Sequence, residues 1–139
     1  MSAADRYRRF LLGTAAFVFA GTLVELWLIG HNEEWIQWVP YGLAVLGLGA
    51  VAAVRFGSAP RRLGVARVVL GLVMAGSLFG VYEHFEHNLS FEQEIRPGVP
   101  ALDLLGEAVR GASPLLASGI LLLGAALAFA ATLWREAPD

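Results

Sequence analysis

Residues 82–94 are the part of this chain whose side chains are best suited to chemistry. The segment holds two of the three histidines and four of the twelve acidic residues. If it is helical, His84 and His87 are neighbours at spacing i,i+3, and Glu83 and His87 at spacing i,i+4. One helix face can then offer two imidazoles, or an imidazole and a carboxylate, to one ion. Such ligands suit zinc, iron or manganese, and also copper, so the segment predicts a divalent-metal site.

A solvated, charged helix end is the alternative interpretation of the same residues. Carboxylate-bridged di-metal bundles use Glu-x-x-His pairs. Here Glu83-x-x-Glu86 and His84-x-x-His87 replace that order. Further along, Glu92 and Glu94 alternate about Gln93 and would point the same way in an extended segment. We expect these two carboxylates to face water.

Two more candidate ligands, Glu25 and His31, lie at the end of the first long apolar run. Glu25 sits about four residues, or roughly 6 Å of helix, inside that end. A charged carboxylate there is costly, so it must be protonated, paired or open to water. It could be a snorkelling or hydrogen-bonded side chain, a partner of Arg96 or Arg110, or a metal ligand or proton carrier. The predicted metal ligands are Glu25, His31, Glu83, His84 and His87, with Glu86 ranked below them.

Other kinds of site find little support in the sequence. Haem would need histidines inside the hydrocarbon on facing helices, and all three histidines lie at its boundary, which argues against haem. The chain has no cysteine, which excludes thiolate metal sites and disulfides. No Ser/His/Asp order, phosphate-binding glycine loop or basic run with interleaved aromatics occurs, so nucleic acid is not an expected partner. A non-catalytic protein is favoured, with a small enzyme or electron carrier as a lesser alternative.

The elements that carry these residues are predicted to be membrane-spanning helices. The chain has 139 residues, 57% of them apolar, and a mean hydropathy of +0.61, whereas soluble domains are about 45–50% apolar. A hydrocarbon core about 30 Å thick needs about 20 helical residues. The first run also fits the apolar part of a signal peptide but is long for one, so we take it as a retained span. Four spans are predicted, at about 10–29, 39–56, 63–82 and 115–134.

The predicted fold is therefore all-α, a four-helix transmembrane bundle forming a single domain over residues 1–139. The third helix should continue one or two turns past Tyr82 and break near residues 88–90. After a turn at Pro97, Gly98 and Pro100, residues 101–110 predict a short outer amphipathic helix. Its apolar face would be Leu102, Leu105 and Val109. That helix would lie in the membrane interface or form a lid over the bundle.

The distribution of the arginines along the chain predicts how the protein is oriented in the membrane. Cytoplasmic loops of membrane proteins are enriched in basic residues. Four spans put both termini and the turn at 57–62 on one side, which then holds eight of the ten arginines: Arg6, Arg8, Arg9, Arg55, Arg61, Arg62, Arg67 and Arg135. Arg67, one turn inside the third span, could snorkel outward. We expect an inner-membrane protein with both termini in the cytoplasm and the Glu/His cluster outside.

Small residues at four-residue spacing predict close helix packing. The pairs are Gly76/Gly80, Gly49/Ala53 and Gly124/Ala128. Lipid gives helices no hydrophobic reason to associate, so small residues that allow close approach supply the contact energy. The contacts could form a tight monomeric bundle. They could also join partner membrane subunits or a homo-oligomer, which makes an accessory subunit of a larger complex the alternative function.

Two short patterns resemble signatures of small four-span bacterial membrane proteins of unassigned activity. They are Glu25-x5-His31-x5-Gln37-x2-Pro40 and His87-Asn88-x2-Phe91-Glu92-x-Glu94-x2-Pro97. The resemblance covers about a third of the chain. It implies the same four-span architecture and no particular activity.

Overall fold

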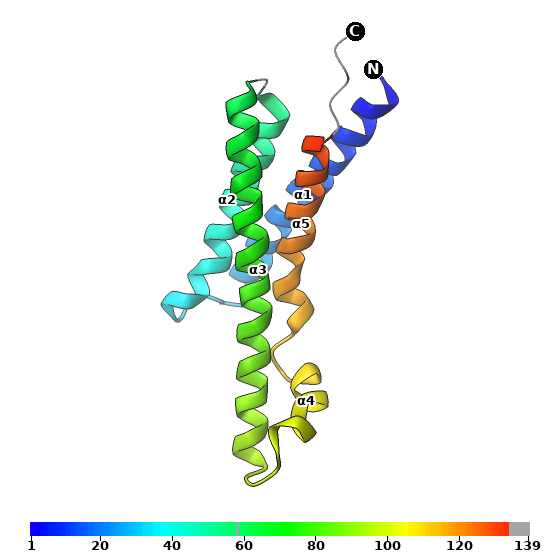
Figure 1. Cartoon of the computed structure of the whole chain (residues 1–139). Coiled ribbons are helices and arrows are strands. Elements are labelled where there is room, and N and C mark those ends of the chain that lie inside the picture. Colours follow the sequence, from blue (N-terminus) through cyan, green and yellow to red (C-terminus); the bar gives the residue numbers. More distant parts are fainter. Residues whose placement is uncertain (58, 134–139) are drawn as a thin grey trace.

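The computed structural model describes residues 1–57 and 59–133, and within these ranges the chain is helical throughout its regular structure (Figure 1). The elements in chain order are α1 (Ala3–Leu28), the short 3-10 helix η1 (Trp35–Trp38), α2 (Val39–Phe56), α3 (Pro60–Ile95), α4 (Ala101–Arg110) and α5 (Leu115–Leu133). Four of them, with η1 counted as the start of α2, are long and apolar enough to cross a membrane. The protein is an all-α, four-span membrane protein, as the sequence predicts.

Local sequence signals account for where the helices begin. Ser2 caps α1 through its hydroxyl, which accepts a hydrogen bond from the Asp5 N–H at 3.1 Å, as expected for a capping box. Prolines occupy the first turns of α2 and α3, where the missing N–H costs nothing. The first and third helices extend beyond the predicted spans because their polar ends continue the helix outside the apolar stretch. Residues 134 and 135 of the predicted fourth span and its flank lie outside the described residues.

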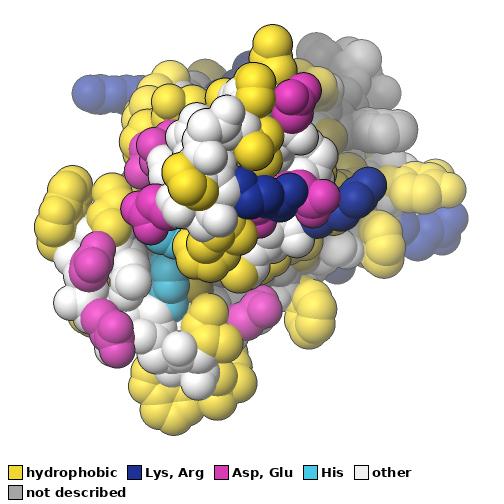
Figure 2. All heavy atoms as spheres, turned by 90° about the horizontal axis from the view of Figure 1, so that it is seen from below, with side chains coloured by type: hydrophobic (Ala, Val, Ile, Leu, Met, Phe, Trp, Pro, Cys, Tyr) yellow, Lys and Arg dark blue, Asp and Glu magenta, His cyan; other side chains and the backbone are white. Residues whose placement is uncertain are grey.

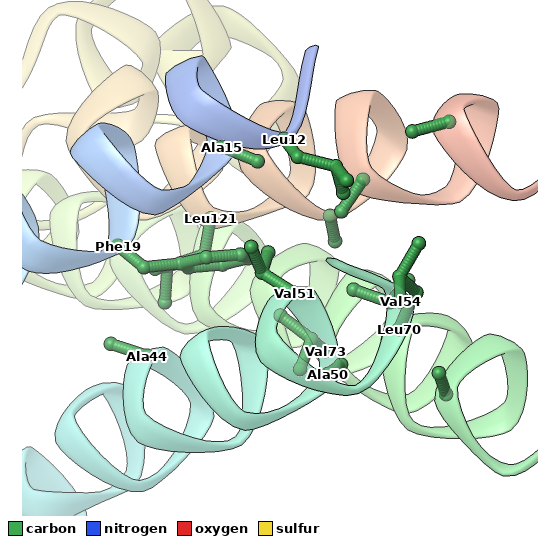
Figure 3. Close-up of a cluster of buried hydrophobic side chains, with 14 residues drawn as sticks. Leu12, Ala15, Phe19, Ala44, Ala50, Val51, Val54, Leu70, Val73 and Leu121 are labelled. Carbon is green, nitrogen blue, oxygen red and sulfur yellow. The ribbon is translucent and has the colours of Figure 1, made fainter. Parts of the chain in front are cut away.

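The core of the bundle is organised around Phe19 of α1, which is fully buried. Figure 3 shows Phe19 within the cluster of buried hydrophobic side chains. Its ring packs against glycines of two other helices. A Cβ added to Gly47 of α2 would lie 2.4 Å from the ring, and one added to Gly124 of α5 would lie 3.3 Å from it. These glycines therefore make room for the one large aromatic side chain at the centre.

Small-residue packing inside the bundle agrees with most of the predicted pairs. A Cβ on Gly76 would meet the Leu43 side chain of α2 at 2.8 Å, and one on Gly80 would meet Ser118 of α5 at 3.4 Å. Gly124 and Ala128 are both buried. Gly49 differs, because a Cβ there would meet nothing within 4 Å.

The predicted break near residues 88–90 is wrong, because α3 runs without interruption to Ile95. The helix α4 has the predicted bounds, but Leu104 and Ala108 face α3 and are fully buried, while Leu102 and Val109 are exposed. Its extensive packing within the described chain is with α3, so α4 is not a lid across the other spans. Figure 1 shows α4 beside the projecting end of α3, away from both termini.

Candidate functional site

His31 is positioned by the way α1 ends. The Gly30 N–H donates to the Trp27 carbonyl at 3.2 Å, and the His31 N–H donates to the Leu26 carbonyl at 3.0 Å. This pair of hydrogen bonds is a Schellman motif, which needs a left-handed residue after the helix. Gly30 supplies it with φ 66°, a conformation that glycine adopts without strain. The turn fixes the backbone of His31 and takes the residue off the face of α1 that carries Glu25.

His84 lies on the face of α3 that packs against the rest of the bundle. Ser77, two turns earlier on that face, is buried and donates to the Ser118 carbonyl of α5 at 2.7 Å. The same hydroxyl accepts from the Leu122 N–H at 3.0 Å. Asn88, one turn after His84, is also buried. His84 lies on α3 between these two buried polar residues and is itself half-buried.

His31 and His84 are near enough to influence each other electrostatically although they are far apart in the sequence. The pKa of His31 is lowered, first by burial and then by the charge of His84. The Nδ1 atom of His84 is buried and has no hydrogen-bond partner. A buried polar atom without a partner costs about 1–3 kcal/mol. The site thus contains a ring nitrogen that a bound water or ligand would satisfy. Figure 2 shows histidine side chains in a recess at this end, with acidic side chains nearby.

The other predicted ligands do not complete a closed metal site. Glu25 and His87 are exposed, and Glu83 is half-buried. Glu86 is exposed and accepts a hydrogen bond from the Ser90 hydroxyl at 3.1 Å. Among residues 1–57 and 59–133, no three histidine or acidic side chains are grouped closely enough to hold one ion.

The alternatives for Glu25 and for the later glutamates are also resolved. Arg96 pairs with Glu92 of its own helix, and within the described chain no ion pair reaches Glu25. Glu92 and Glu94 lie in α3 rather than in an extended segment. Residues two apart in a helix face different directions, so the shared direction expected for an extended segment does not arise. Glu94 is exposed, as expected, whereas Glu92 is partly buried and pairs with Arg96.

Asn88 is the functional residue that sequence reasoning missed. Its Nδ2 donates to the Ala108 carbonyl at 3.0 Å and to the Ser113 carbonyl at 2.9 Å, and its Oδ1 accepts from the Ser113 N–H at 2.9 Å. A Cβ on Gly111 would lie 2.4 Å from the Asn88 side chain. Asn88 therefore fastens the end of α4 and the connection to α5 onto α3. The signal in the sequence that could have identified Asn88 is its position on the same helical face as Ser77 and His84.

Comparison of the chain with protein-family models, with curated proteins and with solved structures finds no match. The function must therefore be argued from the site itself.

Proposed function

We propose that this protein is a small, non-catalytic protein of the bacterial inner membrane that binds a divalent cation at its outer end through His31 and His84. The observation that carries the proposal is the buried, unpartnered Nδ1 of His84, a residue whose charge also acts on His31. Neutral imidazole nitrogens bind zinc, copper and iron. A cation shared by the two rings would satisfy the unpartnered nitrogen.

Water would fill the remaining coordination positions. Structural zinc sites use four protein ligands and catalytic sites keep an open position. With two protein ligands, this site resembles the open kind and should bind its ion more weakly than a closed site does. Weak, exchangeable binding suits a protein that binds and releases a cation at the membrane surface rather than one that stores it.

The arginines support an outward orientation for this site. The N-terminal end of α1, the C-terminal end of α5 and the turn between α2 and α3 lie at one end of the bundle (Figure 1). Arg8 donates to the Val54 carbonyl at 2.5 Å, and Arg67 bonds to Thr132, so both also serve the fold. The five remaining described arginines at that end are exposed: Arg6, Arg9, Arg55, Arg61 and Arg62. The positive-inside bias therefore persists after the structural arginines are set aside.

Calorimetric titration of the purified protein with zinc or copper salt tests the cation site. We expect one ion per chain. We expect His31→Ala and His84→Ala each to lower affinity at least about tenfold, the loss typical when residues supporting a metal site are removed. His87→Ala is the matched control, because His87 is an exposed histidine one turn further along α3. Equal binding by wild type, His31→Ala and His84→Ala would refute the proposal.

Two glutamine variants separate the two-histidine site from the wider ligand set. Glu25→Gln and Glu83→Gln keep side-chain size and remove charge. If the two imidazoles are the protein ligands, both variants retain wild-type affinity. A loss as large as that of His84→Ala would mean that a carboxylate is also a ligand.

A second candidate function is an accessory subunit in a larger membrane complex. The supporting observation is that Gly42 and Gly49 of α2, and Gly64 and Gly71 of α3, have no neighbour within 4 Å of an added Cβ. Each pair is seven residues apart and shares a helix face. Gly42, Gly49 and Gly64 are exposed and Gly71 is half-buried, and small residues with open space beside them allow another transmembrane helix to approach closely.

Crosslinking in native membranes tests this function, because the natural chain has no cysteine. A single cysteine at Gly49 or Gly71 should form a product with a partner subunit. A cysteine at the buried Gly124 serves as the control. Absence of any product from Gly49→Cys and Gly71→Cys would count against the accessory role.

A further inference from the structure

The last turns of α3 and the whole of α4 project beyond the rest of the bundle. The 36 residues of α3 make it about 54 Å long at 1.5 Å per residue, whereas the hydrocarbon core is about 30 Å thick. Near the start of α5, a Cβ on Gly119 would lie 3.7 Å from Val81 of α3. Leu115, one turn before Gly119, is therefore level with about residue 84 of α3. The part of α3 beyond that level rises roughly 16 Å further.

This projecting unit, residues 85–110, is hereafter the outer hairpin. Asn88 ties its two helices together near the base through the Ala108 carbonyl, so α4 packs along α3. Leu104 and Ala108 fill the contact between the helices and are fully buried. The hairpin is thus a fixed two-helix column.

A second apolar face on the outer hairpin is left uncovered. On α4, Leu102 is 80% exposed and Val109 is 58% exposed. Leu105, between them on the same face, is 39% exposed, and Phe91 of α3 is 53% exposed. Large apolar side chains exposed together are unusual on surfaces that face water and mark contact sites. Because α3 is much longer than the hydrocarbon core is thick, lipid tails cannot cover both the spans and the whole of this face.

Charge indicates what kind of partner covers this face. The outer hairpin contains five acidic residues and two arginines, a formal charge of −3 with histidine neutral. Asp103 and Glu107 lie along α4 and are exposed. A second copy would bring the same negative charge, and like charges across an interface are unfavourable. An anionic lipid surface is disfavoured for the same reason.

We propose that the outer hairpin is a docking site for a basic amphipathic helix of a partner protein. The partner's apolar side chains would cover Leu102, Leu105 and Val109, and its lysines or arginines would lie opposite Asp103 and Glu107. Helix-in-groove recognition uses this combination of apolar anchors and flanking charge. The proposal does not depend on cation binding by His31 and His84.

Peptide binding to the full chain in zwitterionic lipid nanodiscs tests the proposal. The probe is a fluorescent leucine/lysine peptide about four turns long with an amphipathic pattern, and its counterpart replaces every lysine by glutamate. We expect saturable binding of the lysine peptide, at least about tenfold stronger than to empty nanodiscs, and no binding of the glutamate peptide. Equal binding to empty nanodiscs would show that lipid is the receptor and would overturn the proposal.

Paired variants locate the binding surface. Leu102→Glu with Val109→Glu should abolish binding, and Asp103→Lys with Glu107→Lys should reverse the preference toward the glutamate peptide. These positions are exposed, so helical content and melting temperature should stay at the wild-type level.

Glu33→Lys with Glu34→Lys is the matched control, because it makes the same charge change at exposed residues outside the hairpin. An equal loss in that control would mean general electrostatic attraction. Self-association abolished by Leu102→Glu with Val109→Glu would make a second copy the occupant. Either result overturns the proposal.

Discussion

Arg67 of α3 donates two hydrogen bonds to Thr132 of α5, one to the hydroxyl at 2.9 Å and one to the carbonyl at 2.8 Å. The side chain is therefore held against α5 and does not extend outward as expected for a snorkelling arginine. Thr132 is buried in α5, where a carbonyl or hydroxyl group left without a partner would be costly. Arg67 thus closes the contact between α3 and α5 at the end of the bundle that holds the N-terminus.

Replacing Arg67 by methionine should destabilise the bundle by about 1–3 kcal/mol, the cost of leaving a buried acceptor unpaired. Methionine keeps most of the apolar stem, so the effect comes from the lost hydrogen bonds. Thermal unfolding in detergent, followed by tryptophan fluorescence, measures the change. Arg6→Met is the control, because Arg6 is exposed. Equal melting temperatures for the two variants would mean that the hydrogen bonds from Arg67 to Thr132 do not stabilise the bundle.

Gly47 and Gly49 give a matched test of core packing around Phe19. They lie two residues apart on α2, but an added Cβ would be 2.4 Å from the Phe19 ring at Gly47 and in open space at Gly49. Gly47→Ala should destabilise the protein by about 1–3 kcal/mol through overpacking. Gly49→Ala should be neutral or stabilising, because alanine favours helix by up to about 1 kcal/mol.

The double variant Gly47→Ala with Phe19→Leu tests whether a clash with the Phe19 ring is what makes Gly47→Ala destabilising. The smaller side chain should relieve the clash, so the two substitutions together should cost less than the sum of their separate effects. Additive costs would mean that Phe19 is not what Gly47 accommodates.

Asn88 should control the position of α4 without affecting the spans. Asn88→Asp keeps the oxygen that accepts from Ser113 but loses the Nδ2 donor to Ala108 and Ser113. We expect faster amide hydrogen exchange in α4 and unchanged exchange in α1 and α2, because stability is local to packed units. Asn32→Asp, at an exposed asparagine, is the control. Unchanged exchange in α4 would show that Leu104 and Ala108 alone hold the hairpin.

Local patterns predicted much of this fold, and long-range contacts explain the exceptions. Helix α4 and the end of α2 have their predicted bounds because the apolar periodicity and the flanking Pro and Gly residues fix them locally. The break expected near Asn88 does not occur, because tertiary partners satisfy the amide that would otherwise compete with the helix.

The candidate site was predictable only as a set of residue types at one end of the bundle. Which two side chains meet depends on the turn at Gly30 and on the register of α3 against α5. Neither can be read from spacing along the chain, so the sequence could not separate His84 from His87.

The environment of His31 predicts a pH-dependent stability. Burial, and then the charge of His84, lower the pKa of His31 below its ordinary value of 6.5. The folded protein therefore takes up a proton at His31 less readily than the unfolded chain does. The free energy of unfolding therefore has its full value above the pKa that His31 has in the unfolded chain. It decreases as the pH falls from there through the lower pKa that His31 has in the folded protein. Melting temperature should therefore fall on going from about pH 7.5 to about pH 5, the range in which histidine titrates.

Proton NMR of the imidazole resonances measures the site directly, with His31 assigned from the spectrum of His31→Ala. In the wild type, His31 should titrate below 6.5, its ordinary value. In His84→Ala, its pKa should move toward that value but remain lowered, because burial is the larger cause and persists. His87→Ala should leave the His31 titration unchanged. A His31 pKa that does not respond to removal of His84 would show that the two imidazoles do not interact.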